Sequence, residues 1–207
     1  MIRRFLWAYL VMIAMAAPAL VWAQSFPALY DVTGVAADDQ LNIRAEPNAS
    51  AAILGMLGPN LRGVEIITAS DDGRWGMINV GEQSGWISLR FMQRWEQGDY
   101  ALTRRLACHG TEPFWSFDLV QGGQSVMQSM DGIGQIYTTG LMIAARGFTG
   151  SHAIQGSDKA GEFTAMVHNR SCSDGMSDQN FGLEIGILTT GSGETEMLSG
   201  CCSLLGN

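Results

Sequence analysis

The chain of 207 residues is long enough for one large domain or for two small ones. Apolar residues make up 46% of it, and 26 glycines with only five prolines are typical of short strands joined by turns, which excludes a disordered or collagen-like chain. The formal charge of −8 leaves no basic surface of the kind that collects phosphates, so we expect no nucleic-acid partner.

Residues 1–23 have the three-part pattern of an export signal. Arg3 and Arg4 precede an apolar run over residues 5–17, and small residues follow before the expected cleavage site. An uncleaved membrane anchor is the alternative, but Pro18 interrupts the helix before it is long enough to span a bilayer. We therefore expect a cleaved signal peptide and a periplasmic or secreted protein. A membrane is an expected partner only if the segment stays uncleaved.

Export changes how the charges and the cysteines are interpreted. Loss of the two signal arginines would lower the charge from −8 to −10, and such an acidic protein is not drawn to anionic surfaces. Exported proteins fold in oxidising compartments, where disulfides form and persist. We therefore expect the four cysteines to be paired.

Residues 24–95 are expected to form a small antiparallel barrel. Short segments of alternating hydrophobicity are separated by turn signals, and no stretch has a convincing helical period. The expected strands lie at residues 41–44, 53–57, 64–67, 75–80 and 85–88.

Two stretches of this region, LNIRAEPNASAAILGML and GRWGMINVGEQSGWISLRFM, resemble the pattern of the bacterial SH3 (SH3b) family. Residues 41–44 match the first strand of that pattern, Pro47 matches its loop, and Trp75 and residues 85–88 match its later elements. Glu46 departs from it, because the family often has glycine there. The resemblance implies a binding module that recognises peptidoglycan, its peptides or a partner protein.

Aromatic side chains are the candidate ligand contacts of this module, since rigid rings supply a large contact area. We single out Tyr30, Trp75 and Phe91. The alternative is that such rings, Trp75 and Trp86 in particular, only pack in or beside the core.

Residues 96–105 change to a polar composition and are expected to be a linker to a second domain at residues 106–207. Turn signals separate the expected strands of that domain, which lie at residues 112–120, 124–130, 140–145, 162–169, 181–188 and 196–201. The predicted fold class is therefore all-β, with a small SH3-like barrel followed by a second antiparallel β-barrel or sandwich.

Three fragments of the second domain, CHGTEPFWSFDL, CSDGMSDQNFG and LSGCC, together resemble a family of bacterial envelope proteins, often lipoproteins, whose function is largely unknown. The resemblance implies a fold more than an activity. The matching residues are Glu112, Pro113, Phe114 and Trp115, then Cys172, Asp174, Gly175, Met176, Ser177 and Asp178, then Gly200 and Cys201.

The four cysteines, which permit three pairings, all lie in this domain. A bond between the neighbours Cys201 and Cys202 would strain the backbone, so we expect one of them to join Cys172 and the other to join Cys108. Each bond would contribute about 4 kcal/mol on the chain-entropy model. The alternative is a redox-active or metal-binding vicinal pair.

Four residues of this domain are candidate ligand contacts, namely Glu112, Trp115, Asp174 and Asp178. Met176 together with His109 or His168 has the soft-ligand chemistry of a copper site. The structural alternatives are a turn at Asp174 and a core position for Met176. We therefore expect no resident metal and no cofactor.

A peptidoglycan hydrolase is the main enzyme alternative, because SH3 modules often accompany such enzymes. However, Cys108 and His109 are neighbours, and neighbours on a strand point to opposite faces, so they are poorly placed for a thiolate and base pair. The three histidines do not form H-E-x-x-H, and no G-x-S-x-G elbow is present. We expect a binding protein, not an enzyme, with a protein, a peptide or peptidoglycan as its partner.

Overall fold

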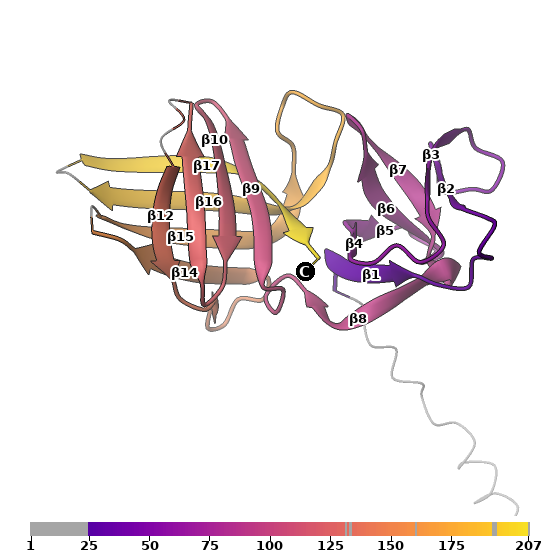
Figure 1. The fold of residues 1–207 in the computed structure, drawn as a ribbon, viewed down its shortest axis with the longest axis horizontal. Helices are drawn as coiled ribbons and strands as arrows, with labels where there is room; N and C mark the ends of the chain where they lie inside the picture. The colour runs from indigo at the N-terminus through magenta and orange to yellow at the C-terminus, as the bar shows by residue number, and fades with distance from the viewer. Residues whose placement is uncertain (1–24, 131, 133, 160, 192–193, 207) are drawn as a thin grey trace, which may run out of the picture.

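The computed structural model describes residues 25–130, 132, 134–159, 161–191 and 194–206, and this part of the chain is all-β, as the sequence predicts. The expected signal peptide at residues 1–23 lies outside the described residues. Within the described residues, no helix has the length and hydropathy needed to cross a bilayer. Figure 1 shows two β units, an N-terminal unit and a larger barrel, arranged along the long axis.

The N-terminal unit consists of two antiparallel sheets, with strand orders β4-β1-β8 and β3-β2-β7-β6-β5. Buried side chains such as Ile43, Ile66, Ile78 and Ile87 form its core. Its elements are β1 (Ala28–Val32), β2 (Leu41–Arg44), β3 (Ile53–Leu57), β4 (Val64–Ile66), β5 (Thr68–Ala69), β6 (Trp75–Val80), β7 (Gln83–Ser88), the 3-10 turn η1 (Leu89–Phe91) and β8 (Met92–Asp99).

The second unit is a closed antiparallel barrel of eight strands. Strands follow the order β12-β11-β10-β9-β17-β16-β15-β14, and the ring closes where Thr138 and Thr139 of β12 pair with β14. The short β13 pairs alongside β14. The strands are β9 (Arg105–Thr111), β10 (Phe114–Val120), β11 (Gln124–Ser129), β12 (Gly134–Thr139), β13 (Ile143–Ala144), β14 (Ser151–Ser157), β15 (Gly161–Cys172), β16 (Phe181–Gly191) and β17 (Glu194–Leu205).

Alternation of side chains along these strands fills the barrel interior. Phe117, Tyr137 and Phe163 come from three different strands and pack edge to face, with ring centroids 5.0 to 6.4 Å apart. Such T-shaped contacts are the favoured arrangement of aromatic rings. The interior is therefore a packed core, and candidate ligand sites must lie on the outside.

Both disulfides are of the expected kind, with one of the two neighbouring cysteines bonded to Cys172 and the other to Cys108, and the structure shows which is which. Cys108 is bonded to Cys202, and Cys172 is bonded to Cys201. Cys108 and Cys202 lie directly opposite one another on β9 and β17, so their bond crosses two paired strands. Disulfides of this kind persist in oxidising, extracellular-type compartments.

Three barrel strands, β9, β12 and β14, were not anticipated, and residues 140–145 contribute only the two-residue β13. Each of these strands has only one or two large apolar inward side chains, such as Leu106, Tyr137 and Ile154, and its other inward positions hold small or polar residues, which makes the hydrophobic alternation weak. Thr139 of β12 is an example: it is buried, and its hydroxyl donates to Ser125 Oγ at 2.7 Å. The packing of these strands depends on partners distant in the sequence.

The two units meet along β1 and β8, so residues 96–105 are not a free linker. Strand β8 continues to Asp99, which pairs with Ala28 of β1. Ala28 and Tyr30 face the core of the N-terminal unit, whereas Leu29 between them is buried in the barrel core and is only 1% exposed. Trp95 of β8 also packs against the barrel core. One strand is therefore buried in two cores.

A second link between the units is Glu65 on β4, the strand that pairs with β1 on the side opposite β8. Glu65 Oε1 accepts a hydrogen bond from the backbone N–H of Leu204 on β17 at 3.0 Å. Burial outweighs this bond and one from Ser203, and it raises the pKa of Glu65 to about 7. Near neutral pH the carboxyl group therefore exchanges a proton at the contact between the units.

We expect Leu29→Ala to lower the free energy of unfolding of the whole chain by about 2–5 kcal/mol, because it leaves a cavity in the barrel core. Leu102→Ala, at a position that is 62% exposed, is the control and should change stability by less than about 0.5 kcal/mol. Urea unfolding followed by tryptophan fluorescence measures both. Equal effects of the two substitutions would show that β1 does not belong to the barrel core.

We expect Glu65→Gln to remove a pH dependence of stability. The carboxyl group loses its proton near pH 4.5 in the unfolded chain and near pH 7 in the folded chain, so stability should fall as the pH rises through this window, by at most about 3 kcal/mol. Glutamine keeps an acceptor for Leu204 without a charge. Urea unfolding at pH 5 and pH 8 measures this: the free energy of unfolding of Glu65→Gln should exceed that of the parent protein only at pH 8. Glu96→Gln, at an exposed position, is the control and should have the same pH dependence as the parent protein.

Candidate functional site

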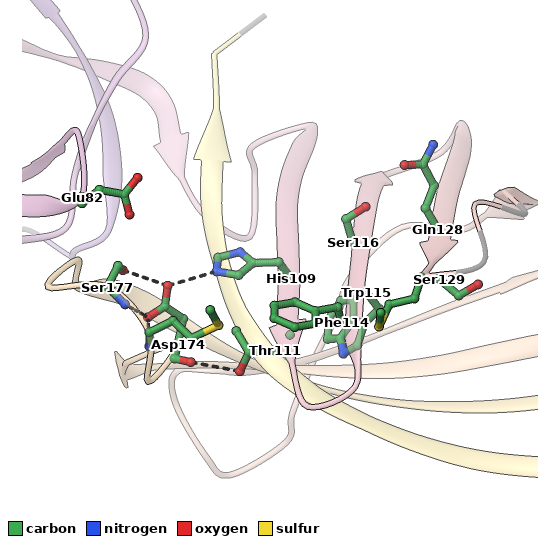
Figure 2. A pocket seen from close by; sticks show the side chains of 13 residues that line it. Glu82, His109, Thr111, Phe114, Trp115, Ser116, Gln128, Ser129, Asp174 and Ser177 are labelled. Carbon is green, nitrogen blue, oxygen red and sulfur yellow. Dashed lines mark hydrogen bonds and ion pairs between the residues drawn. The ribbon is translucent and has the colours of Figure 1, made fainter.

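A solvent-open cleft of about 470 Å³ lies where the barrel meets the N-terminal unit, and we call it the junction cleft. Figure 2 shows Glu82 on one side of it and Phe114 on the other, with His109 and Asp174 between them. The residues that line it are Glu82, His109, Gly110, Thr111, Phe114, Trp115, Ser116, Gln128, Ser129, Met130, Asp174, Met176 and Ser177.

The loop at residues 173–180 forms one wall of the cleft, and Asp174 shapes it. Asp174 Oδ1 accepts the backbone N–H groups of Met176 and Ser177 at 3.0 Å, and its Oδ2 accepts the Ser177 hydroxyl at 2.8 Å. These bonds, led by the backbone bond from Ser177, hold the pKa of Asp174 below its usual range. Thr111 of β9 donates to the carbonyl of Asp174 at 3.0 Å and ties the turn to the barrel.

The rest of this loop binds the β6–β7 hairpin of the N-terminal unit. The backbone N–H of Asp178 donates to the carbonyl of Glu82 at 2.9 Å. The N–H of Asn180 donates to Ser84 Oγ at 2.9 Å, and its carbonyl accepts Asn79 Nδ2 at 2.9 Å. The cleft wall is thus held by both units.

His109 lies in the cleft because it alternates with Cys108, which faces the barrel core. The imidazole packs edge to face on Phe181, with ring centroids 4.9 Å apart. Its Nε2 lies 3.9 Å from Asp174 Oδ2, which is longer than a hydrogen bond. Ser177 donates to Asp174 and not to His109, so these three side chains do not form a nucleophile and base relay.

Trp115 and Phe114 are neighbours in sequence, but one is buried and the other is exposed. Trp115 is 6% exposed and lies over Gly110 and Gly200, where an added Cβ would collide with the indole. Phe114, one residue earlier on β10, points outward and is 48% exposed. The packing of Trp115 explains the need for glycine at position 110, whereas at position 200 the backbone of His109 approaches most closely. Phe114 is left as the aromatic side chain offered to solvent.

The three fragments singled out in the second domain therefore converge on one site. Phe114 and Trp115 line it together with Asp174, Met176 and Ser177, and Gly200 lies against Trp115. A larger cleft of about 970 Å³ continues on the other side of His109 and Phe114. It adds Glu112, Cys172 and Cys201 to the lining.

The electrostatic character of both clefts is acidic. No Lys or Arg lies among the described residues that line them, whereas Glu82, Glu112 and Glu184 do. Of these, Glu184 is neutralised by an ion pair with Arg170. The described residues hold no group of three or more His, Cys, Asp or Glu side chains suited to a metal ion.

The three candidate ligand contacts of the N-terminal unit differ in whether they are buried or line a groove. Tyr30 is 3% exposed and belongs to the core of the unit, so its ring is not on the surface. Trp75 and Phe91 do share a groove, of about 540 Å³, with Arg44 and Arg90. This groove is distinct from the junction cleft, and its lining contains two arginines and one acidic residue, Asp39.

The barrel residues also need corrections. Trp115 lines the junction cleft but is buried, and Asp178 is exposed outside both clefts, where its backbone and not its side chain makes the contact with Glu82. Met176 is not a core residue, since it is 67% exposed. His168 bonds Ser151 Oγ through Nδ1 at 2.8 Å and lines neither cleft, so it does not join Met176.

Sequence reasoning missed Glu82, Thr111 and Phe114 as parts of the site. Glu82 and Thr111 come from different units, and only the tertiary fold brings them near residues 173–178. Phe114 had a usable signal, because alternation along β10 with an inward Trp115 places it outward. Comparisons of the chain with protein-family models, with curated proteins and with solved structures found no match.

We expect Asp174→Ala to lower the free energy of unfolding by about 1–3 kcal/mol at pH 7, because three hydrogen bonds lose their acceptor. The pKa of Asp174 is lowered in the folded chain, so this contribution is present above the unfolded value of 3.8 and is lost as the pH falls below it. Asp178→Ala, in the same loop but exposed, is the control. Equal stability of the two variants in urea at pH 7 would contradict the role of Asp174.

Proposed function

We propose that this protein is an exported binding protein of the bacterial cell envelope, and that a peptide or protein segment occupies its junction cleft. Its N-terminal unit would be a bacterial SH3-type module. The all-β architecture, the two disulfides and the sequence resemblances support this proposal. The cleft is the place where the two units jointly form a surface for a partner.

The exposed ring of Phe114 is the observation that carries the proposal. The barrel buries its other aromatic β10 side chains, Trp115 and Phe117, yet leaves Phe114 open in a cleft whose loop wall is fixed by hydrogen bonds. Rigid aromatic side chains in preformed pockets supply a large share of binding energy at protein interfaces. Phe114 therefore serves as the apolar anchor for the bound segment.

The charge of the cleft selects the partner. Glu82 lies across the junction cleft from Phe114, Glu112 lines the larger cleft that also contains Phe114, and the chain as a whole carries a charge of −8. Such a surface attracts cationic segments and repels acidic ones, which affects association rates and specificity. The preferred ligand is a peptide segment with a Lys or Arg side chain next to an apolar one.

We expect Phe114→Ala to weaken binding of such a peptide about tenfold, equivalent to about 1.4 kcal/mol. Fluorescence anisotropy would compare labelled basic and acidic peptides of matched apolar content. The basic peptides should bind more tightly than the acidic ones, and their binding should weaken as the salt concentration rises. Phe148→Ala is the matched control, since Phe148 is 69% exposed and lines neither cleft. Equal binding by both variants, or a preference for acidic peptides, would contradict the proposal.

Sedimentation with purified peptidoglycan separates this function from binding to the cell wall. The protein should remain in the supernatant at low salt, under conditions in which a known wall-binding protein sediments. If the Phe114→Ala variant still sediments with peptidoglycan but the Trp75→Ala variant does not, the wall is recognised by the groove of the N-terminal unit instead.

A further inference from the structure

The two disulfides lie in different surroundings. Cys108 and Cys202 are 2% and 0% exposed and belong to the barrel core. Cys201 is also buried, but its partner Cys172 is partly exposed. Both Cys172 and Cys201 line the larger cleft beside the junction cleft. One disulfide is therefore enclosed, and the other forms part of the wall of an open cavity.

Access to sulfur controls thiol–disulfide exchange, because a thiolate must attack one sulfur of the bond directly. Cys172 offers such access from the cleft. The bond between Cys108 and Cys202 would be reached only after the barrel core opens. The two bonds should therefore differ in reactivity while the fold is intact.

A second feature favours attack at Cys172 with Cys201 as the leaving group. His109 lies directly opposite Cys201 in the pairing of β9 with β17, so the two side chains project from the same face of the sheet. On the other side of Cys201 lies Glu184, whose charge is paired with Arg170. An imidazole N–H beside the departing sulfur is suited to stabilise it as a thiolate and to supply its proton.

We propose that the Cys172–Cys201 bond is a site of thiol–disulfide exchange with an external dithiol reductant, and that the Cys108–Cys202 bond is purely structural. A thiolate of the reductant bonds to Cys172 Sγ, the sulfur–sulfur bond breaks, and the electron pair leaves on Cys201, which takes up a proton. The second thiol of the reductant then displaces Cys172 as a thiol. The protein bond gains two electrons and two protons, and the reductant becomes a disulfide.

Reduction would change the loop at residues 173–180. Cys172 immediately precedes this loop, and its bond ties the loop to β17. Without it, the loop is held to the barrel by its flanking strands β15 and β16 and by the hydrogen bond from Thr111, and to the N-terminal unit by the hairpin contacts. Selective reduction itself does not depend on what the junction cleft binds.

Timed alkylation tests the proposal on the full oxidised protein. The protein is exposed to dithiothreitol under native conditions, free thiols are blocked with iodoacetamide, and peptide mass spectrometry locates the labels. Cys172 and Cys201 should be labelled at least about tenfold faster than Cys108 and Cys202. Simultaneous labelling of all four cysteines, or earlier labelling of Cys108 and Cys202, would overturn the proposal.

Two further measurements separate local access from global unfolding. The labelling rate of Cys172 should not change at urea concentrations below the unfolding transition, and a rate that rises in parallel with the unfolded fraction would contradict direct access. His109→Gln should slow the reaction about threefold. His168→Gln is the matched control, because His168 lies in the same row of side chains but is separated from Cys201 by Glu184. Equal rates for both variants would remove His109 from the reaction.

Discussion

Adjacent residues on a β-strand point to opposite faces of the sheet, and this constraint on Cys201 and Cys202 organises the barrel around β17. Cys202 faces inward and joins Cys108, which holds β9 against β17 within the core. Cys201 faces outward and joins Cys172 at the start of the cleft loop. The two adjacent cysteines therefore connect the interior of the barrel to the wall of the junction cleft. Because they point to opposite faces of the same strand, their two disulfide bonds lie in different chemical environments.

The junction cleft follows from the same arrangement. Trp115 packs on Gly110 and Gly200 next to the cysteine pair, and alternation then turns Phe114 outward. The loop at residues 173–180 gains its shape from Asp174 and its position from the hairpin of the N-terminal unit. The barrel supplies the aromatic groups and most of the lining, and the N-terminal unit adds Glu82, so the acidic groups of the cleft come from segments far apart in the sequence.

Local patterns in the sequence were sufficient to predict the fold class, most of the strands and the absence of a bond between Cys201 and Cys202, but not which of these two cysteines joins Cys108. Alternating hydrophobicity and glycine turns are local properties, and the adjacency of Cys201 and Cys202 restricts the possible bonds. The missed barrel strands β9, β12 and β14 mix one or two large inward side chains with small or polar ones, so their pattern is weak, and β1 and β8 of the N-terminal unit were also missed. The burial of Tyr30 could not be predicted, because an aromatic residue on a strand has the same sequence pattern whether it faces a core or a ligand. Glu82 could not be found, since only tertiary contacts bring it to the cleft.

The burial of Leu29 also bears on how such a chain could evolve. β1 contributes Ala28 and Tyr30 to one core and Leu29 to the other, so both units were selected around the same five-residue strand. A gene fragment encoding the barrel alone would lack the side chain that fills its core at this contact. The two halves are therefore expected to be inherited and rearranged together, as one evolutionary module.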